Sequence, residues 1–386
     1  MTSDTVFRIG ILRLTDAAPL IVARECGYFA AENIEAVLSV EPSWANVADK
    51  LAYGLLDGAM LLPPLAMALA LGLSGGRGPE AIVAPAALSL NGNTVTLAER
   101  WAAPVLGDGS APAIETARRF NALIKERGEK PVLAVVHTFS THNLLMRYWL
   151  AAGGIDPARD VAFTVVPPAE TVDALAAGRI DGFCAGAPWG AVAAHAGLGR
   201  TVATSSAIWS NGTEKVFAVR RRIAEEQPAG MQAALRAVLR AAAYCDDPAN
   251  ASTVAALLAQ EHYLGLPADI IATSLPGAPA MPAAADISTF SASAANFPWM
   301  SHAEWFLHEM RRWGYLEADA DAKSAAAIFR PDLYAQAAAT LGMPVPTAWI
   351  KSEGRHATDW QLPASPHPIV MGPDLFMDGA SFDPCA

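Results

Sequence analysis

Short apolar runs alternate with longer amphipathic segments through the first part of the chain. Residues 6–12 and 34–40 read as buried strands, because each run is short and rich in Val, Ile and Leu. Residues 19–31 and 44–53 carry apolar side chains at helical spacing and predict helices that follow these strands. Such an alternation is typical of a parallel sheet covered by helices on both faces.

The same rhythm returns in the middle of the chain. Strands are predicted at residues 132–136, 161–166 and 182–185, and helices at 113–127, 141–152 and 170–177. After Asn211 the pattern becomes mostly helical, and the segment from Thr347 is rich in Pro, Gly and Asp. We expect this last segment to wrap the surface.

One short pattern occurs in both halves. Residues 51–58 and 175–182 share the sequence L-A-x-G-x-[LI]-D-G, which runs from a predicted helix end into a predicted strand. Gly54 and Gly178 suit a left-handed helix C-cap, and the Asp-Gly pair turns the chain. This repeat favours two similar α/β lobes facing a cleft, although the same joint could recur in any α/β fold.

Composition narrows the class of protein. The 386 residues are 53% hydrophobic and carry a net charge of −11, without a dense Lys/Arg stripe. Direct nucleic-acid binding is therefore not expected. The best apolar run, residues 60–73, is short and is interrupted by Pro63 and Pro64, so no membrane insertion is expected.

The N-terminus and the cysteines bear on location. The first residues show no basic start, apolar core or small-residue cleavage site, which predicts a cytoplasmic protein, or a periplasmic one if a signal peptide was removed. The four cysteines, Cys26, Cys184, Cys245 and Cys385, lie far apart without a CxxC motif. We expect free or buried thiols, and neither a disulfide nor a metal site.

No catalytic motif fits its required context. A GxSxG string at residues 72–76 closes a predicted helix, whereas a nucleophile elbow needs a strand before it. The pairs His137/His142 and His302/His308 lack the spacing and partners of a metal motif. The sequence thus predicts a protein that is not an enzyme and needs no cofactor or metal.

Polar and aromatic residues at strand-to-helix junctions remain as candidates, because open α/β sheets bind ligands there. Trp44 opens a predicted helix and could offer a flat face to a ligand, or simply pack in the core. Asn93 follows a strand and could donate hydrogen bonds, or serve a turn. His142 lies at a helix start, where anions bind, or is part of ordinary capping.

Two further candidates come later in the chain. Gly186 lies between a strand and a helix and would let the backbone approach a ligand, unless it is a plain turn glycine. Lys215 lies where the chain is expected to cross between lobes and could neutralise an anion, or be a solvated lysine.

At these residues the sequence resembles the nitrate/bicarbonate-binding family of solute-binding proteins, the NrtA and CmpA type. The resemblance covers nearly the whole chain. It is carried by residues 11–29, 43–45, 51–64, 91–93, 141–143, 147–155, 186–189, 214–215, 296–314 and 376–384.

The resemblance implies a fold and a site. The fold would be α/β, of the periplasmic-binding-protein-like type II, with lobe 1 at 1–95 plus 208–386 and lobe 2 at 96–207. The family's tryptophan, glutamine, histidine, glycine and lysine ligands fall by motif on Trp44, Asn93, His142, Gly186 and Lys215. Asn93 is one methylene shorter than the family's glutamine, so a bridging water is expected between it and a planar anion.

The resemblance also implies a role. It is closest to the cytoplasmic nitrate/nitrite sensors of the NasS type, which would hold a NasT-like RNA-binding antiterminator until nitrate or nitrite binds. The alternative is the periplasmic substrate-binding component of a nitrate/nitrite or bicarbonate ABC transporter. A remote alternative is an enzyme similar to the thiamine-pyrimidine synthases, but the cysteine cluster which that membership would imply is missing from the sequence.

Overall fold

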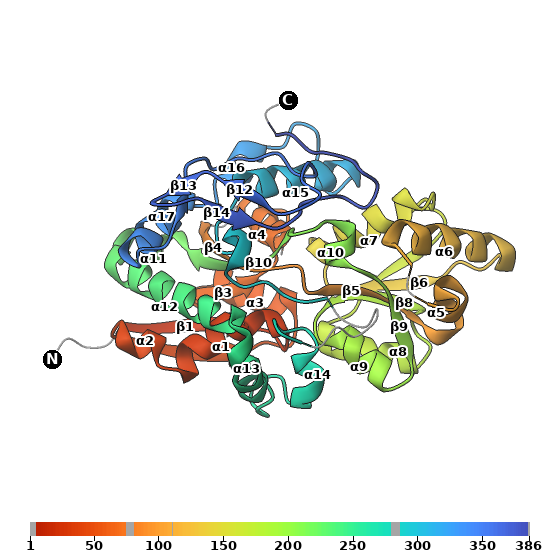
Figure 1. Cartoon of the computed structure of the whole chain (residues 1–386), viewed down its shortest axis with the longest axis horizontal. Helices are drawn as coiled ribbons and strands as arrows, with labels where there is room; N and C mark the ends of the chain where they lie inside the picture. Colours follow the sequence, from red (N-terminus) through yellow and green to blue (C-terminus); the bar gives the residue numbers. More distant parts are fainter. Residues whose placement is uncertain (1–4, 75–80, 110, 279–285, 385–386) are drawn as a thin grey trace.

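A computed structural model describes residues 5–74, 81–109, 111–278 and 286–384. The chain forms two α/β lobes side by side, each built on a five-stranded sheet (Figure 1). The predicted fold class is thereby confirmed. Of the three cysteines in these ranges, Cys184 and Cys245 are buried, Cys26 is exposed, and all are free; Cys385 lies outside the described residues.

Lobe 1 contains the sheet with strand order β2-β1-β3-β10-β4. Its strands are β1 (Thr5–Ile11), β2 (Ile34–Val40), β3 (Gly58–Leu61), β4 (Ile82–Leu90) and β10 (Thr213–Arg220). Its helices before β10 are η1 (Thr15–Ala17), α1 (Ala18–Glu25), α2 (Tyr28–Ala31), α3 (Trp44–Ala52) and α4 (Pro63–Ala70). Those after it are α11 (Arg221–Glu226), α12 (Pro228–Asp246), η3 (Pro248–Asn250), α13 (Ala251–Leu258), α14 (Ala268–Ala272), η4 (Ala292–Ala294), α15 (Met300–Arg312), α16 (Ala322–Ala326) and α17 (Pro331–Thr340).

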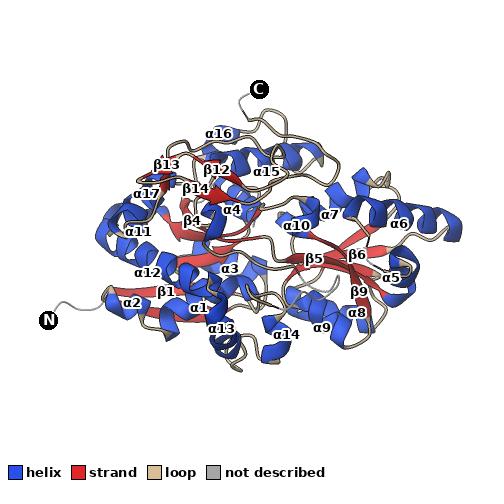
Figure 2. Cartoon of the chain, in the orientation of Figure 1, coloured by secondary structure: helices blue, strands red, loops and turns tan. Residues whose placement is uncertain are grey.

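Lobe 2 contains the sheet β7-β6-β8-β5-β9, which has the same strand arrangement. Its strands are β5 (Asn93–Ala98), β6 (Val132–Val135), β7 (Ala162–Val165), β8 (Gly182–Gly186) and β9 (Gly199–Thr204). Its helices are α5 (Glu99–Leu106), α6 (Ala113–Arg127), α7 (Thr141–Ala152), η2 (Pro168–Glu170), α8 (Thr171–Ala176), α9 (Trp189–His195) and α10 (Ser205–Ile208). Figure 2 shows α6 and α7 on one side of this sheet and α8 and α9 on the other.

Each sheet contains one strand that runs against the others. β10 is antiparallel to β3 and β4, and β5 is antiparallel to β8 and β9. The sequence predicted parallel sheets only, and it did not predict β5 or β10. The difference has a simple cause: both strands enter their sheet directly from the other lobe, so they begin at the end facing the cleft. Their first residues therefore lie beside the carboxyl ends of the parallel strands.

The repeated sequence joint has the same structure in both lobes. Gly54 and Gly178 have left-handed φ angles of 74° and 65°. The Asp57 carboxylate accepts a hydrogen bond from the backbone N–H of Arg8 on the neighbouring strand, and Asp181 does the same for Val132. In both cases the two residues are 49 positions apart. The repeat thus marks two structurally equivalent lobes.

Some predicted boundaries differ from the structure. The predicted helix at 19–31 is divided into α1 and α2, because Gly27 between them has a left-handed φ of 77°. The GxSxG string follows helix α4, as expected, although its Gly75 and Gly76 lie outside the described residues. The predicted boundary between lobe 1 and lobe 2, after residue 95, falls within strand β5. The exact residues at which the lobes divide stay a prediction.

The C-terminal strap, residues 347–384, runs over the outside of lobe 1 (Figure 1). It forms small antiparallel pairs: β12 (Trp360–Leu362) with β14 (Ile369–Met371), and β13 (Ala364–Ser365) with the preceding β11 (Val345–Pro346). The strap also touches lobe 2, because the Tyr148 hydroxyl of α7 donates a 2.9 Å hydrogen bond to Asp378. Phe376 stacks on the Tyr148 ring at 5.7 Å between centroids.

Candidate functional site

The five residues singled out by sequence all lie at the interface between the lobes. Trp44 is the first residue of α3, and Lys215 is on β10, both in lobe 1. Asn93 begins β5, His142 is in the first turn of α7, and Gly186 ends β8, all in lobe 2. The side chains of Trp44, Asn93, His142 and Lys215 are fully buried, so the alternative of a solvated Lys215 is wrong.

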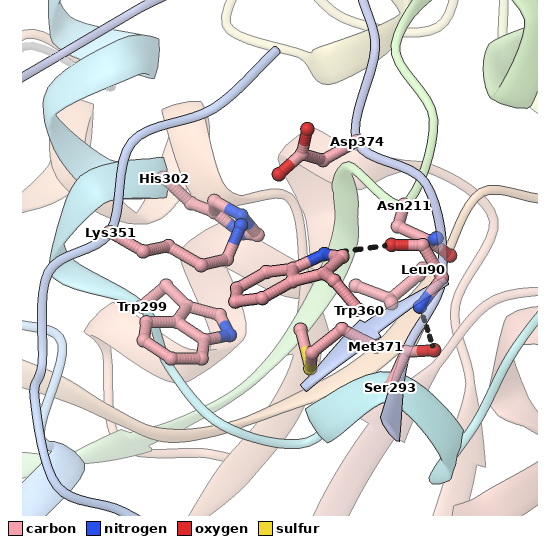
Figure 3. A pocket seen from close by; sticks show the side chains of 10 residues that line it. Leu90, Asn211, Ser293, Trp299, His302, Lys351, Trp360, Met371 and Asp374 are labelled. Atoms are coloured by element: carbon pink, nitrogen blue, oxygen red, sulfur yellow. Dashed lines mark hydrogen bonds between the residues drawn. The ribbon is translucent and has the colours of Figure 1, made fainter. Parts of the chain in front are cut away.

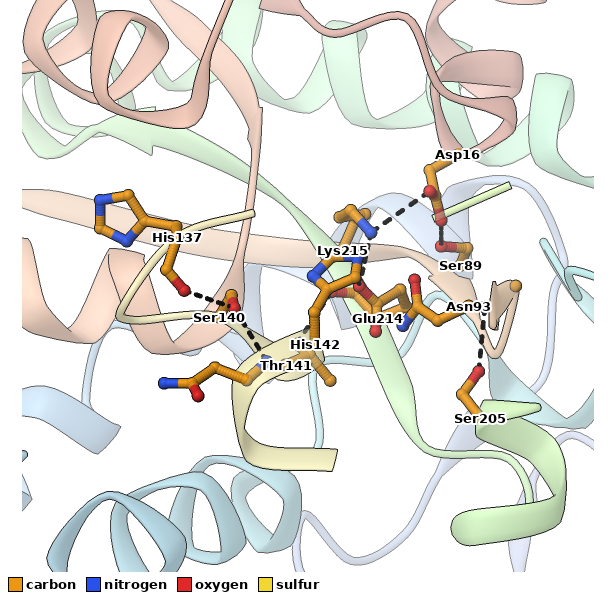
Figure 4. Close-up of polar contacts among 12 residues, drawn as sticks. Asp16, Ser89, Asn93, His137, Ser140, Thr141, His142, Ser205, Glu214 and Lys215 are labelled. Atoms are coloured by element: carbon orange, nitrogen blue, oxygen red, sulfur yellow. Dashed lines mark hydrogen bonds and ion pairs between the residues drawn. The ribbon is translucent and has the colours of Figure 1, made fainter. Parts of the chain in front are cut away.

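Figure 4 shows Asn93 and His142 close to Lys215. The Lys215 Nζ lies 5.6 Å from the centroid of the Trp44 ring, which is within cation–π range. Asn93 and Gly186 are directly paired across β5 and β8. A Cβ atom built on Gly186 would lie 3.4 Å from Asn93 Oδ1, so the absence of a side chain there keeps the space beside Asn93 open.

Two acidic residues that the sequence did not single out belong to the same cluster. Lys215 Nζ lies 3.2 Å from Asp16 Oδ2 and 2.5 Å from Glu214 Oε1. Glu214 Oε1 in turn lies 3.4 Å from His142 Nε2. Asp16 is held by the Ser89 hydroxyl, which donates to its Oδ1 at 2.6 Å. Both carboxyl groups are almost fully buried.

A sequence signal existed for each of these acids. Asp16 follows the first strand, which is the same kind of junction that pointed to the other candidates. Glu214 directly precedes Lys215. Neither was selected, because an acid is not the residue type expected beside an anion.

Burial sets the protonation of the cluster. Burial alone would lower the pKa of Lys215, but the charges of Asp16 and Glu214 raise it, so the lysine stays cationic. Burial lowers the pKa of His142 well below its usual value, and Lys215 lowers it further, so the ring is neutral. Burial raises the pKa of Glu214 to about 8, with Lys215 opposing the rise and Asp16 adding to it. At pH 7 Glu214 is therefore mainly protonated.

Several polar atoms of the site have no hydrogen-bond partner among the described residues. They are Trp44 Nε1, both amide atoms of Asn93 and both ring nitrogens of His142. An unpaired buried donor is costly, so such atoms rarely gather without a ligand to satisfy them. The neutral His142 ring and the Trp44 indole each supply one N–H donor, and the Asn93 amide supplies two.

Two helix starts point at the cluster. Ser43 and Ser140 are the N-caps of α3 and α7, and their side chains accept from the N–H groups of Asn46 and Asn143. These caps fix Trp44 and His142 in the first turn of each helix. The exposed N–H groups and the dipole of a helix N-terminus favour negative charge.

The buried Asp286 forms hydrogen bonds at the start of β5, where the chain passes from lobe 1 into lobe 2. The N–H of Asn93 donates to the Ser205 hydroxyl at 3.0 Å, and Ser205 is hydrogen-bonded to Asp286. Asp286 also accepts from the N–H of Gly92 at 3.0 Å and from Ser206. Asn93 is therefore positioned by the segment that joins the lobes.

A cavity of about 320 Å³ opens between the lobes, at the outer edge of this interface. It is lined by Leu12, Arg13, Val40, Glu41 and Pro42 from lobe 1 and by Pro168, Ala169 and Glu170 from lobe 2. None of the five candidates lines it, although Pro42 lies two residues before Trp44. In the ranges that the structure describes, no group of three or more His, Cys, Asp or Glu residues could hold a metal ion.

A second buried cluster contains similar chemistry beneath the C-terminal strap (Figure 3). A cavity of about 10 Å³, roughly the size of one water, is lined among others by Trp299, His302, Lys351 and Asp374. Lys351 Nζ lies 5.4 Å from the Trp299 ring centroid and 2.5 Å from Glu353 Oε2. The Lys351–Glu353 pair thus resembles the Lys215–Glu214 pair in its distance and in its tryptophan neighbour.

The fold and the site define a two-lobed solute-binding protein. A sequence model of the NMT1-like family matches residues 2–259. The chain belongs to this family.

Relatives narrow the similarity. The chain is 30% identical to the nitrate/nitrite binding protein NrtA of Synechocystis sp. over 393 residues, which cover 98% of this chain and 82% of NrtA. It is 35% identical to the nitrate import ATP-binding protein NrtC of the same organism over 344 residues, covering 87% of this chain. The matched region is only 50% of NrtC, so the chain spans about half the length of that relative.

A solved structure supports the same homology. The crystal structure of the periplasmic nitrate-binding protein NrtA from Synechocystis PCC 6803 superposes with a TM-score of 0.83 and 28% identity, covering 98% of this chain and 96% of NrtA. The chain is therefore homologous to the NrtA nitrate-binding proteins. No helix in the described part of the chain is long and apolar enough to cross a membrane.

Proposed function

We propose that this protein binds nitrate or nitrite between its lobes and serves as the substrate-binding component of an ABC transporter. One observation supports the anion most directly: among the described residues, the buried donors of Trp44, Asn93 and His142 have no hydrogen-bond partner, and they lie around the buried ammonium group of Lys215. The homology to nitrate/nitrite binding proteins supports the choice of anion.

The chemistry of the cluster suits a small monovalent anion. Such an anion loses strong hydration on burial, so it needs a charged partner and several directed donors. Lys215 would supply the charge, and His142, Asn93 and Trp44 the donors. Gly186 would leave room, and closure of the lobes would exclude water and strengthen each interaction.

The sensor role remains a separate prediction. The cytoplasmic location and the NasT-like antiterminator partner come from the resemblance and the first residues of the sequence. The relatives found by comparison support the transporter alternative better, because they are named as nitrate import and nitrate-binding proteins. The relative NrtA, which is matched over most of its length, is named as a nitrate-binding protein, and this favours a protein that is not an enzyme.

Isothermal titration calorimetry of the purified protein with nitrate, nitrite and bicarbonate tests the proposal. We expect saturable binding of nitrate or nitrite at one site per chain. Heat with bicarbonate alone would assign the site to the other anion of the family, and no heat with any of the three would refute anion binding here.

Replacing Trp44 with phenylalanine is expected to weaken anion binding by about 10- to 100-fold. The variant keeps a planar ring but removes the Nε1–H donor, and a hydrogen bond to a charged group contributes about 1.5–3 kcal/mol. Calorimetry of the variant measures the change.

Trp101→Phe is the matched control for Trp44→Phe. The Trp101 Nε1 donates to Asp181 at 3.1 Å inside lobe 2, away from the site. This variant should lose some stability and keep its affinity. Equal affinity of both variants would show that the Trp44 indole N–H does not contact the ligand.

A further inference from the structure

The buried lysine of the site faces two carboxyl groups. Asp16 Oδ2 and Glu214 Oε1 lie 3.2 Å and 2.5 Å from Lys215 Nζ, and all three side chains are at most 1% exposed. With both carboxyl groups ionised, two carboxylates and one ammonium would leave a net negative charge in a dry site. An entering anion would add a second uncompensated charge, which is unfavourable in a low-dielectric interior.

The cluster under the C-terminal strap shows what one lysine does for one glutamate. Glu353 accepts from Lys351 Nζ at 2.5 Å and from the Ser301 hydroxyl at 3.0 Å, and His302 Nε2 lies 3.2 Å away. Burial alone would raise the pKa of Glu353, but Lys351 and His302 lower it to about 2. Glu353 is ionised because Lys351 and His302 together outweigh the effect of burial.

Glu214 differs because burial outweighs the effect of Lys215 on its pKa, and because Asp16, which lies against the same lysine, adds to the rise. We propose that the site binds its anion only with the Glu214 carboxyl group protonated, and that an ionised Glu214 takes up one proton from solvent when the anion binds. The proposal rests on the proposed function. With Glu214 protonated, the Lys215–Asp16 pair is neutral, and the bound anion is the only uncompensated charge.

Other titratable groups face Glu214. They come from several elements: Lys215 on β10, Asp16 on η1, His142 on α7 and Cys184 on β8. Burial lowers the pKa of His142 well below its usual value and raises the pKa of Cys184 well above it. The pKa of Lys215 is raised by its two acids against the effect of burial. Since the pKa of Glu214 is raised to about 8, its proton is the one exchanged near that pH.

The affinity for the anion should therefore fall as the pH rises through the pKa of Glu214. Below pH 8 Glu214 is protonated before the anion arrives, and above pH 8 the anion must bring a proton with it. The competent fraction falls from about 0.9 at pH 7 to about 0.1 at pH 9, so the apparent Kd should rise about tenfold. At pH 8 each bound anion should take up about half a proton.

Calorimetry with nitrate measures both quantities on the intact chain. Titrations at pH 8 in two buffers of different ionisation enthalpy give the number of protons taken up, and titrations at pH 7 and pH 9 give the affinity ratio. No nitrate binding at pH 7 would refute the proposed function itself. Nitrate binding without proton uptake, and with one affinity from pH 7 to pH 9, would overturn this inference alone.

Glu214→Gln gives the second test. A neutral amide reproduces the charge of the protonated acid, so the variant should bind nitrate with the same affinity at pH 7 and pH 9 and without proton uptake. Glu353→Gln, at a buried glutamate that also pairs with a lysine, should keep the wild-type pH dependence. A Glu214→Gln variant that keeps the tenfold change would assign the proton elsewhere and overturn the inference. The wild-type titrations decide alone if this variant does not fold.

Discussion

Replacing Lys215 with methionine is expected to abolish anion binding, with a loss of affinity greater than about 100-fold. Lys215 is the buried cation of the cluster, and without it an anion would meet the Asp16 carboxylate and no compensating charge. The variant should also lose about 3–5 kcal/mol of unfolding free energy, because one partner of a buried ion pair is removed. Calorimetry with nitrate and chemical denaturation measure the two effects.

Lys351→Met separates these effects. Lys351 is largely buried, pairs with a glutamate at 2.5 Å and lies over a tryptophan ring, but it belongs to the cluster formed by the strap itself. Its removal should cost similar stability and leave the affinity unchanged. If both variants lost binding equally, the effect would be one of stability, and Lys215 would have no direct role in the site.

Replacing Gly186 with valine is expected to close the site by steric exclusion, with binding weakened by about 30-fold or more. A Cβ at this position would already lie 3.0 Å from Asp16 Oδ2 and 3.2 Å from Leu14 Cδ2, and the branched methyl groups extend further. Overpacking of this kind costs about 1–3 kcal/mol. A β-branched residue suits a strand, so the fold should persist, and circular dichroism with calorimetry would show both.

Gly109→Val is the control in the same lobe. A Cβ at Gly109 meets no atom within 4 Å, so this variant should bind and fold as the wild type does. A Gly186→Val variant with normal affinity would show that the ligand does not occupy the space between Asn93 and Asp16.

The sequence predicted the α/β class and the two-lobe arrangement because apolar periodicity and a repeated joint are local signals. It did not predict β10, since the short apolar run after Lys215 lies at the start of a region that reads as helical. The strand is fixed by its neighbours β3 and β4, which are remote in the chain.

Among the residues of the candidate site, too, some could be predicted from local sequence signals and others could not. Trp44, Asn93, His142 and Gly186 stand at element ends, which a sequence can indicate, and the structure brings them together with Lys215. Asp16 and Glu214 were not selected, because their role depends on a shared lysine and on burial. Charge compensation of this kind is a property of three-dimensional proximity, and no spacing rule contains it.

The residues of the site are spread over both lobes and stand at the ends of elements. Neither lobe alone carries a complete set. Ligand recognition is therefore assigned to the positions where the two lobes meet, whereas the fold depends on the interior of each lobe. The same pair of sheets supports solved structures named for nitrate and for alkanesulfonate, the latter at only 17% identity to this chain. The shared fold therefore does not determine the ligand, and a difference in ligand is expected to depend on the residues where the two halves meet.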